Sequence, residues 1–234
     1  MTTNAADGTT PDLSGRSVLI TGAGDGLGAA LATACGRAGA EVILLGRTVR
    51  KLEAVYDAIV AAGGPEPAIY PLDLEGAAPN DYEELAGRVE GACGRLDALV
   101  HNAAVLGEQT PLEFQSPLEW ARTLQVNLTG PLLLTQACLP LLRRAERGDI
   151  VFVGDERRGA YWGGYGVSKA AAAALAEMLA EELERDTGLQ VHRIEPGPMR
   201  TGFRARAFPG ALAEEAPLPE ERAVPAILER LARA

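Results

Sequence analysis

Cysteines and long apolar segments are scarce in this sequence, and basic residues are outnumbered by acidic ones. Cys35, Cys93 and Cys138 are the only cysteines among 234 residues; they are far apart, and each stands in an apolar or helical context. We therefore expect buried free thiols in a reducing compartment, with neither a disulfide framework nor a metal site.

No segment reads as a membrane span or a leader. The most apolar run, residues 131–142, is too short to cross a bilayer and contains Gln136 and two prolines. Residues 1–8 show no basic region followed by an apolar core. The formal net charge of −10 disfavours nonspecific binding to nucleic acid or anionic membranes, because those surfaces are themselves negative. We expect a cytoplasmic protein that binds neither.

What the chain does contain is a regular alternation of short apolar runs and helical patterns. Strands are predicted at residues 18–20, 42–45, 69–72, 96–101 and 149–153. The first predicted helix follows the first strand and runs to about residue 37, and the second runs from an N-cap at Thr48 to the glycines at 63 and 64. Further helices are predicted over residues 82–89, 120–144 and 165–184. Such alternation is typical of an α/β protein with a doubly wound parallel sheet. We predict a disordered tail at 1–14, one dinucleotide-binding catalytic domain at 15–202 and a C-terminal extension at 203–234.

Residues 21–28, TGAGDGLG, form a glycine-rich turn between the first strand and the helix after it. A strand that turns sharply into a helix directs unpaired N–H groups and the positive end of the helix dipole at one point. The glycines allow a phosphate to approach the backbone closely. This predicts a dinucleotide pyrophosphate site, and the alternative is a tight loop that only packs helix on strand.

The end of the second strand bears on which dinucleotide is bound. Gly46 stands where NAD-preferring folds place an acid, and Arg47 follows it. Because an arginine fork suits a 2′-phosphate, NADP is favoured and NAD is the second choice. Alternatively, Arg47 only caps or solvates the loop. Asp73, after the third strand, is placed either to meet the adenine or to cap a turn.

Three polar features follow at places where this fold binds ligands. The turn HNAA at 101–104 ends the fourth strand. Asn127 lies in an apolar stretch, and by itself reads as a helix-interior amide satisfied by backbone groups. Tyr165 and Lys169 share one face of a predicted helix. An ammonium there would lower the pKa of the phenol, so the pair could move a proton to or from an oxygen. The alternative is a surface tyrosine stacked on a lysine stem.

These features occur in the order and spacing of the classical short-chain dehydrogenase/reductases, which the chain resembles over about residues 13–205. The resemblance rests on TGxxxGxG at 21–28, HNAA, Asn127, the Tyr165-x-x-x-Lys169 pair and EPG at 195–197. Longer phrases are most similar to the bacterial YciK-type branch: LLGR at 44–47, LDL at 72–74, WGGY at 162–165 and AFP at 207–209. The resemblance implies a single domain with a Rossmann-type fold.

The resemblance also implies roles and a reaction. Tyr165 would be the general acid/base, and Lys169 would hold the nicotinamide ribose and tune Tyr165. Asn127 would anchor a proton-relay water, and Asn102 and Thr201 would flank the cofactor. The reaction would be hydride exchange between nicotinamide C4 and a small or medium carbonyl or alcohol. Further cofactor-binding positions implied are Thr21, Gly22, Gly24, Asp25, Gly26, Leu27, Gly28, Leu74, Ala103, Pro196, Gly197 and Met199.

The chain departs from the family after the fifth strand. The family has a serine there, about thirteen residues before its tyrosine, that donates a hydrogen bond to the substrate oxygen. This chain has Gly154 and Asp155 instead, with no serine or threonine between Thr135 and Ser168. Losing one such donor typically costs about 10²–10³ in rate. Asp155 could donate only if protonated; as a carboxylate it would raise the pKa of Tyr165. The alternative, which we prefer, pairs Asp155 with Arg157, Arg158 or solvent.

The C-terminal region departs as well. The family finishes with a seventh strand, but residues 203–234 contain no β-rich run and one short helix at about 224–232. We therefore expect six strands and an open sheet edge, with Trp162 and Phe203 lining the substrate cleft.

Three functional hypotheses follow. The first is an NADP-dependent oxidoreductase, slowed by the missing serine. The second is a cofactor-binding protein with little turnover that serves as a sensor or partner subunit. The third, compatible with both, is a structural homodimer or homotetramer built through helices at about 118–144 and 164–185, an arrangement that the family resemblance implies.

Overall fold

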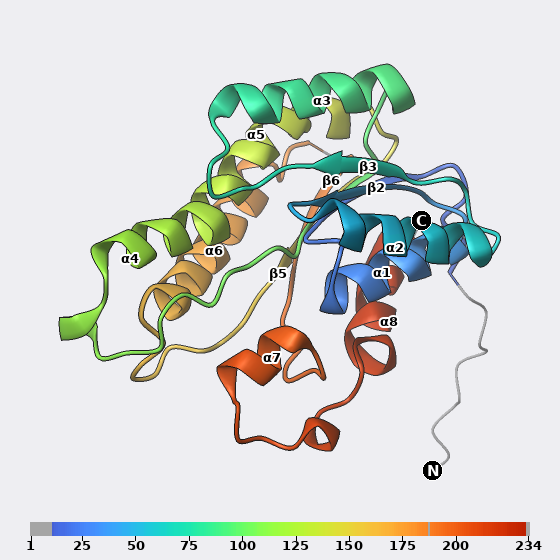
Figure 1. Ribbon diagram of the computed structural model, residues 1–234. Coiled ribbons are helices and arrows are strands. Elements are labelled where there is room, and N and C mark those ends of the chain that lie inside the picture. Colours follow the sequence, from blue (N-terminus) through green and yellow to red (C-terminus); the bar gives the residue numbers. More distant parts are fainter. Residues whose placement is uncertain (1–10, 187, 233–234) are drawn as a thin grey trace, which may run out of the picture.

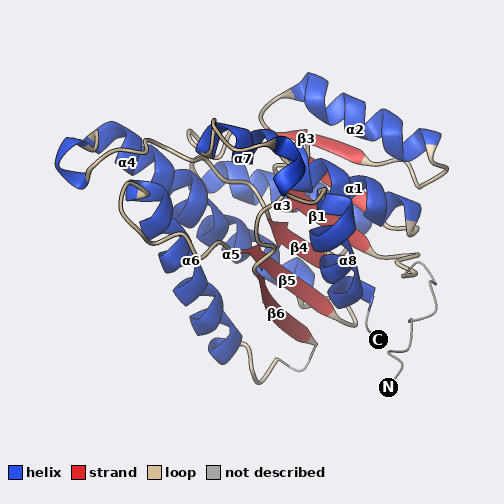
Figure 2. Ribbon diagram, turned by 90° about the horizontal axis from the view of Figure 1, so that it is seen from below, coloured by secondary structure: helices blue, strands red, loops and turns tan. Residues whose placement is uncertain are grey.

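The computed structural model describes residues 11–186 and 188–232 and shows a parallel six-stranded sheet between two layers of helices (Figures 1 and 2). The strands lie in the order β3-β2-β1-β4-β5-β6. They are β1 (Ser17–Thr21), β2 (Glu41–Gly46), β3 (Ala68–Pro71), β4 (Ala98–His101), β5 (Gly148–Val153) and β6 (Leu189–Ile194). The predicted doubly wound fold with six strands is confirmed. The strand order reverses between β1 and β4, which is where such sheets open a crevice for ligands.

The helices divide between the two faces of the sheet. They are α1 (Gly26–Arg37), α2 (Val49–Ala61), α3 (Pro79–Cys93), α4 (Pro117–Leu124), α5 (Gly130–Leu142), α6 (Gly163–Glu182), α7 (Gly202–Ala207) and α8 (Pro219–Ala232), with short turns η1 (Leu112–Phe114), η2 (Gln125–Thr129) and η3 (Ala213–Glu215). One core contains residues of α1, α2 and α8, and the other contains residues of α3, α5 and α6. In β1, Val18 and Ile20 face the first core and Leu19 faces the second, so the strand is apolar on both sides.

Helix α8 makes the C-terminal region part of the main core rather than an extension of it. Its side chains Ile227 and Leu231 are fully buried in the cluster that includes α1. Each such side chain stabilises the fold by about 1.5–3 kcal/mol relative to exposure. The predicted boundary at residue 202 therefore has no counterpart in the packing. The predicted tail also needs correction: Leu13 is fully buried in the same cluster, and residues 1–10 lie outside the described residues.

The helix predicted at 120–144 is interrupted at the position of Asn127. Helix α4 passes into the π-helical turn η2 before α5 begins, and the amide of Gly130 donates to the carbonyl of Gln125, five residues back. Pro131 has no amide hydrogen to donate to Asn127, which gives a physical reason for the wider turn. Thr48 does precede α2 in an extended conformation, but its hydroxyl makes no capping hydrogen bond.

Strand β6, to which the sequence pattern assigned no range, closes one edge of the sheet beside β5. Only Leu189 in it is buried. Its alternation of apolar and polar residues is that of an edge strand, which a search for continuous apolar runs passes over. Among the described helices, none combines the length and apolar character that crossing a bilayer would need. Cys35 and Cys138 are buried free thiols, as predicted, and Cys93 is a half-buried one.

Large apolar side chains are exposed along the helices for which an oligomer interface is predicted. Leu118 on α4, Leu132 on α5, and Val167 and Met178 on α6 are 75%, 38%, 46% and 54% exposed. Val167 and Met178 are three helical turns apart and so share one side of α6. The oligomer stays a prediction, and these residues indicate where it is to be tested.

We expect a Val167→Glu/Met178→Glu double variant to elute as a single chain, because two carboxylates cannot be desolvated in an apolar interface. Size-exclusion chromatography with light scattering measures the mass. Val60→Glu is the control, since Val60 is equally exposed (46%) but lies on α2, and should leave the mass unchanged. A wild-type protein that is already monomeric would contradict the prediction.

Candidate active site

The glycine-rich turn joins β1 to the N-terminus of α1 at the carboxyl edge of the sheet. Gly22 and Gly26 have left-handed φ angles of 66° and 50°, which favour glycine. A Cβ on Gly28 would lie 2.2 Å from the carbonyl oxygen of Gly22, so a side chain there would push the helix off the turn. The carboxylate of Asp25 caps α1 by accepting from the amide of Gly26 at 2.8 Å. This places a helix N-terminus where the sequence predicts a pyrophosphate site.

Thr21 and Asn102 tie this turn to the loop after β4. The Thr21 hydroxyl donates to the carbonyl of Val100 at 3.2 Å and accepts from the amides of Asn102 and Ala103, both at 3.0 Å. The Asn102 side-chain amide donates to the carbonyls of Thr21 at 2.9 Å and Gly22 at 3.3 Å. The two loops are thus held as one wall, before any ligand is bound.

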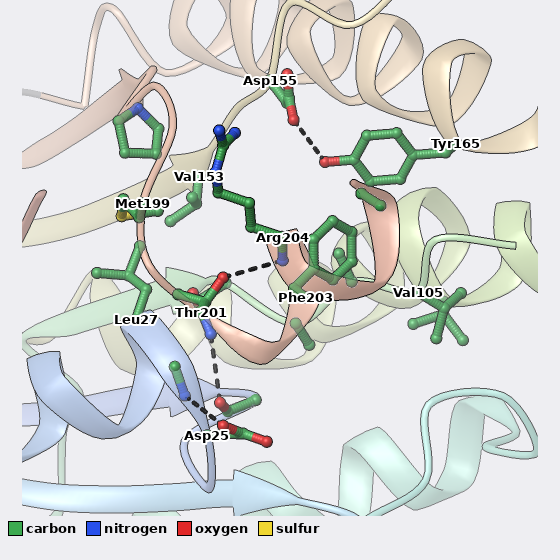
Figure 3. Close-up of a pocket in the computed structure, with 18 of the residues that line it drawn as sticks. Asp25, Leu27, Val105, Val153, Asp155, Tyr165, Met199, Thr201, Phe203 and Arg204 are labelled. Carbon is green, nitrogen blue, oxygen red and sulfur yellow. Dashed lines mark hydrogen bonds between the residues drawn. The ribbon is translucent and has the colours of Figure 1, made fainter. Parts of the chain in front are cut away.

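A cavity of about 820 Å³ runs along this edge of the sheet. Figure 3 shows Asp25 and Leu27 from the glycine-rich turn on one side of it and Asp155 and Tyr165 on another. The predicted site residues that line it are Gly22, Gly24, Asp25, Gly26, Leu27, Arg47, Asp73, Leu74, Asn102, Ala103, Asp155, Tyr165, Lys169, Pro196, Gly197, Met199 and Thr201. Thr21, Gly28 and Asn127 do not line it and instead support its walls. One cavity therefore joins the two predicted halves of the site.

Basic groups gather where the second strand ends. Arg47 lines the cavity and pairs with no carboxylate in the described part of the chain. Lys51, on α2, lines it as well and forms an ion pair with Asp25 at 2.5 Å. The sequence contains only two lysines, Lys51 and Lys169, and both line this cavity. Sequence reasoning missed Lys51; its position one helical turn after Arg47 was the available signal. Asp73 caps a turn by accepting from the amide of Glu75 at 3.2 Å, and it also lines the cavity.

Tyr165 is bound to Asp155 rather than to Lys169. Its hydroxyl donates to a carboxylate oxygen of Asp155 at 2.8 Å, as the dashed line in Figure 3 marks. The other carboxylate oxygen accepts from the amide of Arg157 at 3.1 Å. The ammonium of Lys169 donates to the carbonyl of Val153 at 2.9 Å and lies 5.9 Å from the centre of the Tyr165 ring. Asp155 therefore pairs with Arg157, as the sequence interpretation preferred, through the backbone amide and a 3.8 Å ion pair with the guanidinium. It also accepts the hydrogen bond from the phenol of Tyr165.

These contacts set the proton affinities of the site. Burial and then the Asp155 carboxylate raise the pKa of Tyr165 above its ordinary value. Burial lowers the pKa of Lys169 from 10.5 to about 8, against the opposing pull of Asp155 and Glu195. The expectation that Lys169 lowers the pKa of the phenol is therefore wrong for this arrangement. The reason is that the nearest charge to the hydroxyl is an anion.

Asn127 is saturated by local hydrogen bonds, as its isolated interpretation anticipates. Its carbonyl accepts from the amide of Val105 at 2.8 Å, and its amide donates to the carbonyl of Val105 at 2.9 Å and to the hydroxyl of Ser168 at 3.0 Å. The bond to Ser168 ties the turn that contains Asn127 to α6 at the residue before Lys169. A cavity of about 20 Å³ touches Asn127, Lys169 and His101, which is room for about one water molecule. The water-anchoring role of Asn127 stays a prediction that this space permits.

Aromatic rings pack beside the ring of Tyr165. Trp162 and Phe203 lie 5.8 Å and 5.5 Å from its ring, centre to centre, and both line the cavity as expected. Phe208, which sequence reasoning missed, lies 5.6 Å from Trp162 and closes the group. Apolar walls of this kind are typical of a small-molecule site.

The sheet order, the glycine-rich turn and the Tyr165–Lys169 helix define an open parallel α/β protein with a candidate dinucleotide site. The family described as short chain dehydrogenase matches residues 16–211. The uncharacterised oxidoreductase YciK of Escherichia coli K12 is 41% identical over 201 residues, which are 84% of this chain and 79% of that protein. The chain belongs to the short-chain dehydrogenase family and is similar to its YciK-type members.

Two solved structures of the same family are similar over nearly the whole chain. One is from Shigella flexneri 2a strain 301 in complex with NADP, and the other is from Escherichia coli CFT073 in complex with NADPH. Each has a TM-score of 0.92 and 36% sequence identity, and the match covers 96% of this chain and 94% of the other.

The pKa of Lys169 predicts how stability depends on pH. Its folded value of about 8 lies below the ordinary 10.5, so the folded state binds the proton less tightly. Burying the charged ammonium therefore destabilises the folded wild-type protein by its full amount below pH 8, and this destabilisation is lost as the pH rises to 10.5. We expect the stability of Lys169→Met relative to wild type to fall by about 3 kcal/mol over that range.

Urea denaturation at several pH values measures this difference. Lys51→Met is the matched control, because the Lys51 side chain is 55% exposed, and its difference from wild type should change little. A difference between Lys169→Met and wild type that does not vary with pH would show that the ammonium is not desolvated.

Proposed function

We propose that this protein is an NADP(H)-dependent oxidoreductase that exchanges a hydride between the nicotinamide and a small or medium carbonyl or alcohol. The observation that carries the proposal is the single cavity that joins the glycine-rich turn to Tyr165 and Lys169. The fold supplies the crevice, and these side chains supply a proton-transfer group within it.

The cavity fits the cofactor in three places. The glycine-rich turn and the N-terminus of α1 would hold the pyrophosphate. Position 24 in this turn has space only for backbone, because a Cβ on Gly24 would lie 2.9 Å from the Lys51 side chain. Arg47 and Lys51 would hold the 2′-phosphate. Lys169 and Thr201 would lie by the nicotinamide and its ribose. When bound, the nicotinamide supplies or accepts the hydride. The NADP and NADPH complexes of the two related proteins support this choice.

Tyr165 would move the proton. In reduction its hydroxyl would give the proton to the carbonyl oxygen, and the phenolate that is left would lie beside Asp155, with the ammonium of Lys169 5.9 Å from the centre of its ring. The phenol is protonated near pH 7, the form that reduction requires, but Asp155 and burial raise the pKa of Tyr165 and so make it a weaker acid than a free phenol. Oxidation would need the phenolate, and the carboxylate opposes it. We infer that reduction is slow, because Tyr165 is a weaker acid than a free phenol and Asp155 provides no neutral hydroxyl to the substrate oxygen.

Asp155 also gives a specific reason for a second candidate function. A cofactor-binding protein with little turnover would keep the glycine-rich turn and Arg47 while lacking the family's serine. NADPH fluorescence titration combined with a broad carbonyl panel separates the two functions. Tight NADPH binding without oxidation of NADPH would favour the second.

We expect Tyr165→Phe to lower kcat/KM for any reduced carbonyl by about 10²–10⁴-fold, the usual contribution of a general acid. The Kd for NADPH should change only a few-fold, because the ring is kept. Steady-state NADPH oxidation and fluorescence titration measure the two quantities. Activity that survives this substitution would show that another group donates the proton.

We expect Arg47→Ala to weaken NADPH binding by about 10- to 100-fold, in the range of a lost charge-assisted hydrogen bond. NADH has no 2′-phosphate, so its Kd should change much less. Arg50→Ala is the matched control, since Arg50 is on the neighbouring turn and does not line the cavity. Equal losses for NADPH and NADH would remove the basis for the NADP preference.

A further inference from the structure

Two arginines are stacked on one aromatic ring beside Tyr165. The guanidinium carbons of Arg157 and Arg204 each lie 5.1 Å from the centre of Phe208. They are therefore no more than twice that distance apart. Arg157 also lies 5.5 Å from the centre of Trp162, whose ring contacts Tyr165. Stacking on a ring fixes a guanidinium in place and leaves the N–H groups at its edge available to a planar anion.

Neither guanidinium is neutralised by a hydrogen-bonded carboxylate in the described chain. The nearest carboxylate oxygen to Arg157 belongs to Asp155 at 3.8 Å, beyond hydrogen-bond distance. That carboxylate is engaged by the Tyr165 hydroxyl and the Arg157 amide. Arg204 is half-buried and forms no ion pair among these residues; Figure 3 shows its side chain extending from α7 into the cavity.

The charge of the cavity contrasts with that of the whole protein. The chain has a formal net charge of −10, yet seven basic and five acidic residues line the cavity. Three of the basic residues, Arg47, Lys51 and Lys169, are accounted for by the cofactor. Arg157 and Arg204 lie instead against Phe208 and Trp162, in the aromatic group that includes Tyr165, which is where the substrate would meet the proton donor.

We propose that the substrate carries a carboxylate, which Arg157 and Arg204 bind while its carbonyl oxygen meets Tyr165. This inference rests on the proposed function and names its substrate class: oxo acids with an apolar or aromatic body that fits between Trp162, Phe203 and Phe208. We assign the anion to the substrate rather than to the cofactor, because the Arg157 guanidinium stacks on Trp162, whose ring contacts Tyr165, and so lies beside the proton donor.

The test compares 4-carboxybenzaldehyde with its neutral methyl ester, methyl 4-formylbenzoate, as substrates of the full chain with NADPH. We expect the wild-type protein to favour the acid by at least about tenfold in kcat/KM. Arg157→Gln and Arg204→Gln should each lower this acid-to-ester ratio by about 10- to 100-fold, because each removes charge-assisted hydrogen bonds to a carboxylate. Arg158→Gln is the control: Arg158 is adjacent but exposed and does not line the cavity, so the ratio should hold.

A binding measurement separates this inference from the proposed function. Calorimetry of benzoate and benzamide with the protein and NADP⁺ should show benzoate binding at least tenfold more tightly, with that preference lost in Arg157→Gln. If no aldehyde is reduced but benzoate is preferred, the proposed function fails and the carboxylate site stands. If both aldehydes are reduced alike, or if benzoate shows no preference, the carboxylate site is wrong whatever the activity. A loss of NADPH affinity in Arg204→Gln without a change in the acid-to-ester ratio would assign Arg204 to the cofactor's phosphates.

Discussion

The parallel pairing of β1, β4 and β5 is the constraint on which the site depends. Because these strands run the same way and are adjacent, the segments that follow them all emerge at one edge of the sheet. The glycine-rich turn, the Asn102 loop and the segment of Asp155 are thereby brought to one cavity from positions some 130 residues apart in the chain. Thr21 and Asn102 then bind the first two together, so the cavity is largely preformed.

Within that frame, Asp155 changes the balance of the proton-transfer group. A phenol beside an ammonium alone is more acidic, whereas a phenol that donates to a carboxylate is less so. In this protein the anion is at hydrogen-bond distance from Tyr165 and the ammonium of Lys169 is bonded to the Val153 carbonyl. The consequence is a group that holds its proton more firmly, which opposes the phenolate that oxidation needs and makes the phenol a weaker acid in reduction. Beside it, Arg157 has only a 3.8 Å ion pair with Asp155, and Arg204 has no ion pair among the described residues, so both guanidinium groups could bind an anionic substrate.

The fold was predicted from patterns that local physics decides. Strand β1 is a short apolar run because both of its faces are covered, and Tyr165 and Lys169 share a side of α6 because of the helical period. Strand β6 and the full extent of α8 were less visible. An edge strand carries alternating polar residues, and α8 is amphipathic, with buried Ile227 and Leu231 but exposed charges between them. The core position of α8 depends on its contact with α1, nearly two hundred residues earlier.

The sequence by itself determined the sheet, the glycine-rich turn, the helical Tyr165–Lys169 pair and the absence of a serine near Asp155. Each of these depends on residue type and on spacings of a few positions, and the periods of strands and helices are set by interactions between residues this close in the chain. Only the tertiary structure decided that Asp155 accepts a hydrogen bond from the Tyr165 phenol, and that Arg157 and Arg204 meet at Phe208. The physical reason is that hydrogen bonds and charge interactions act over a few ångströms, and only folding brings residues so far apart in the chain to such distances.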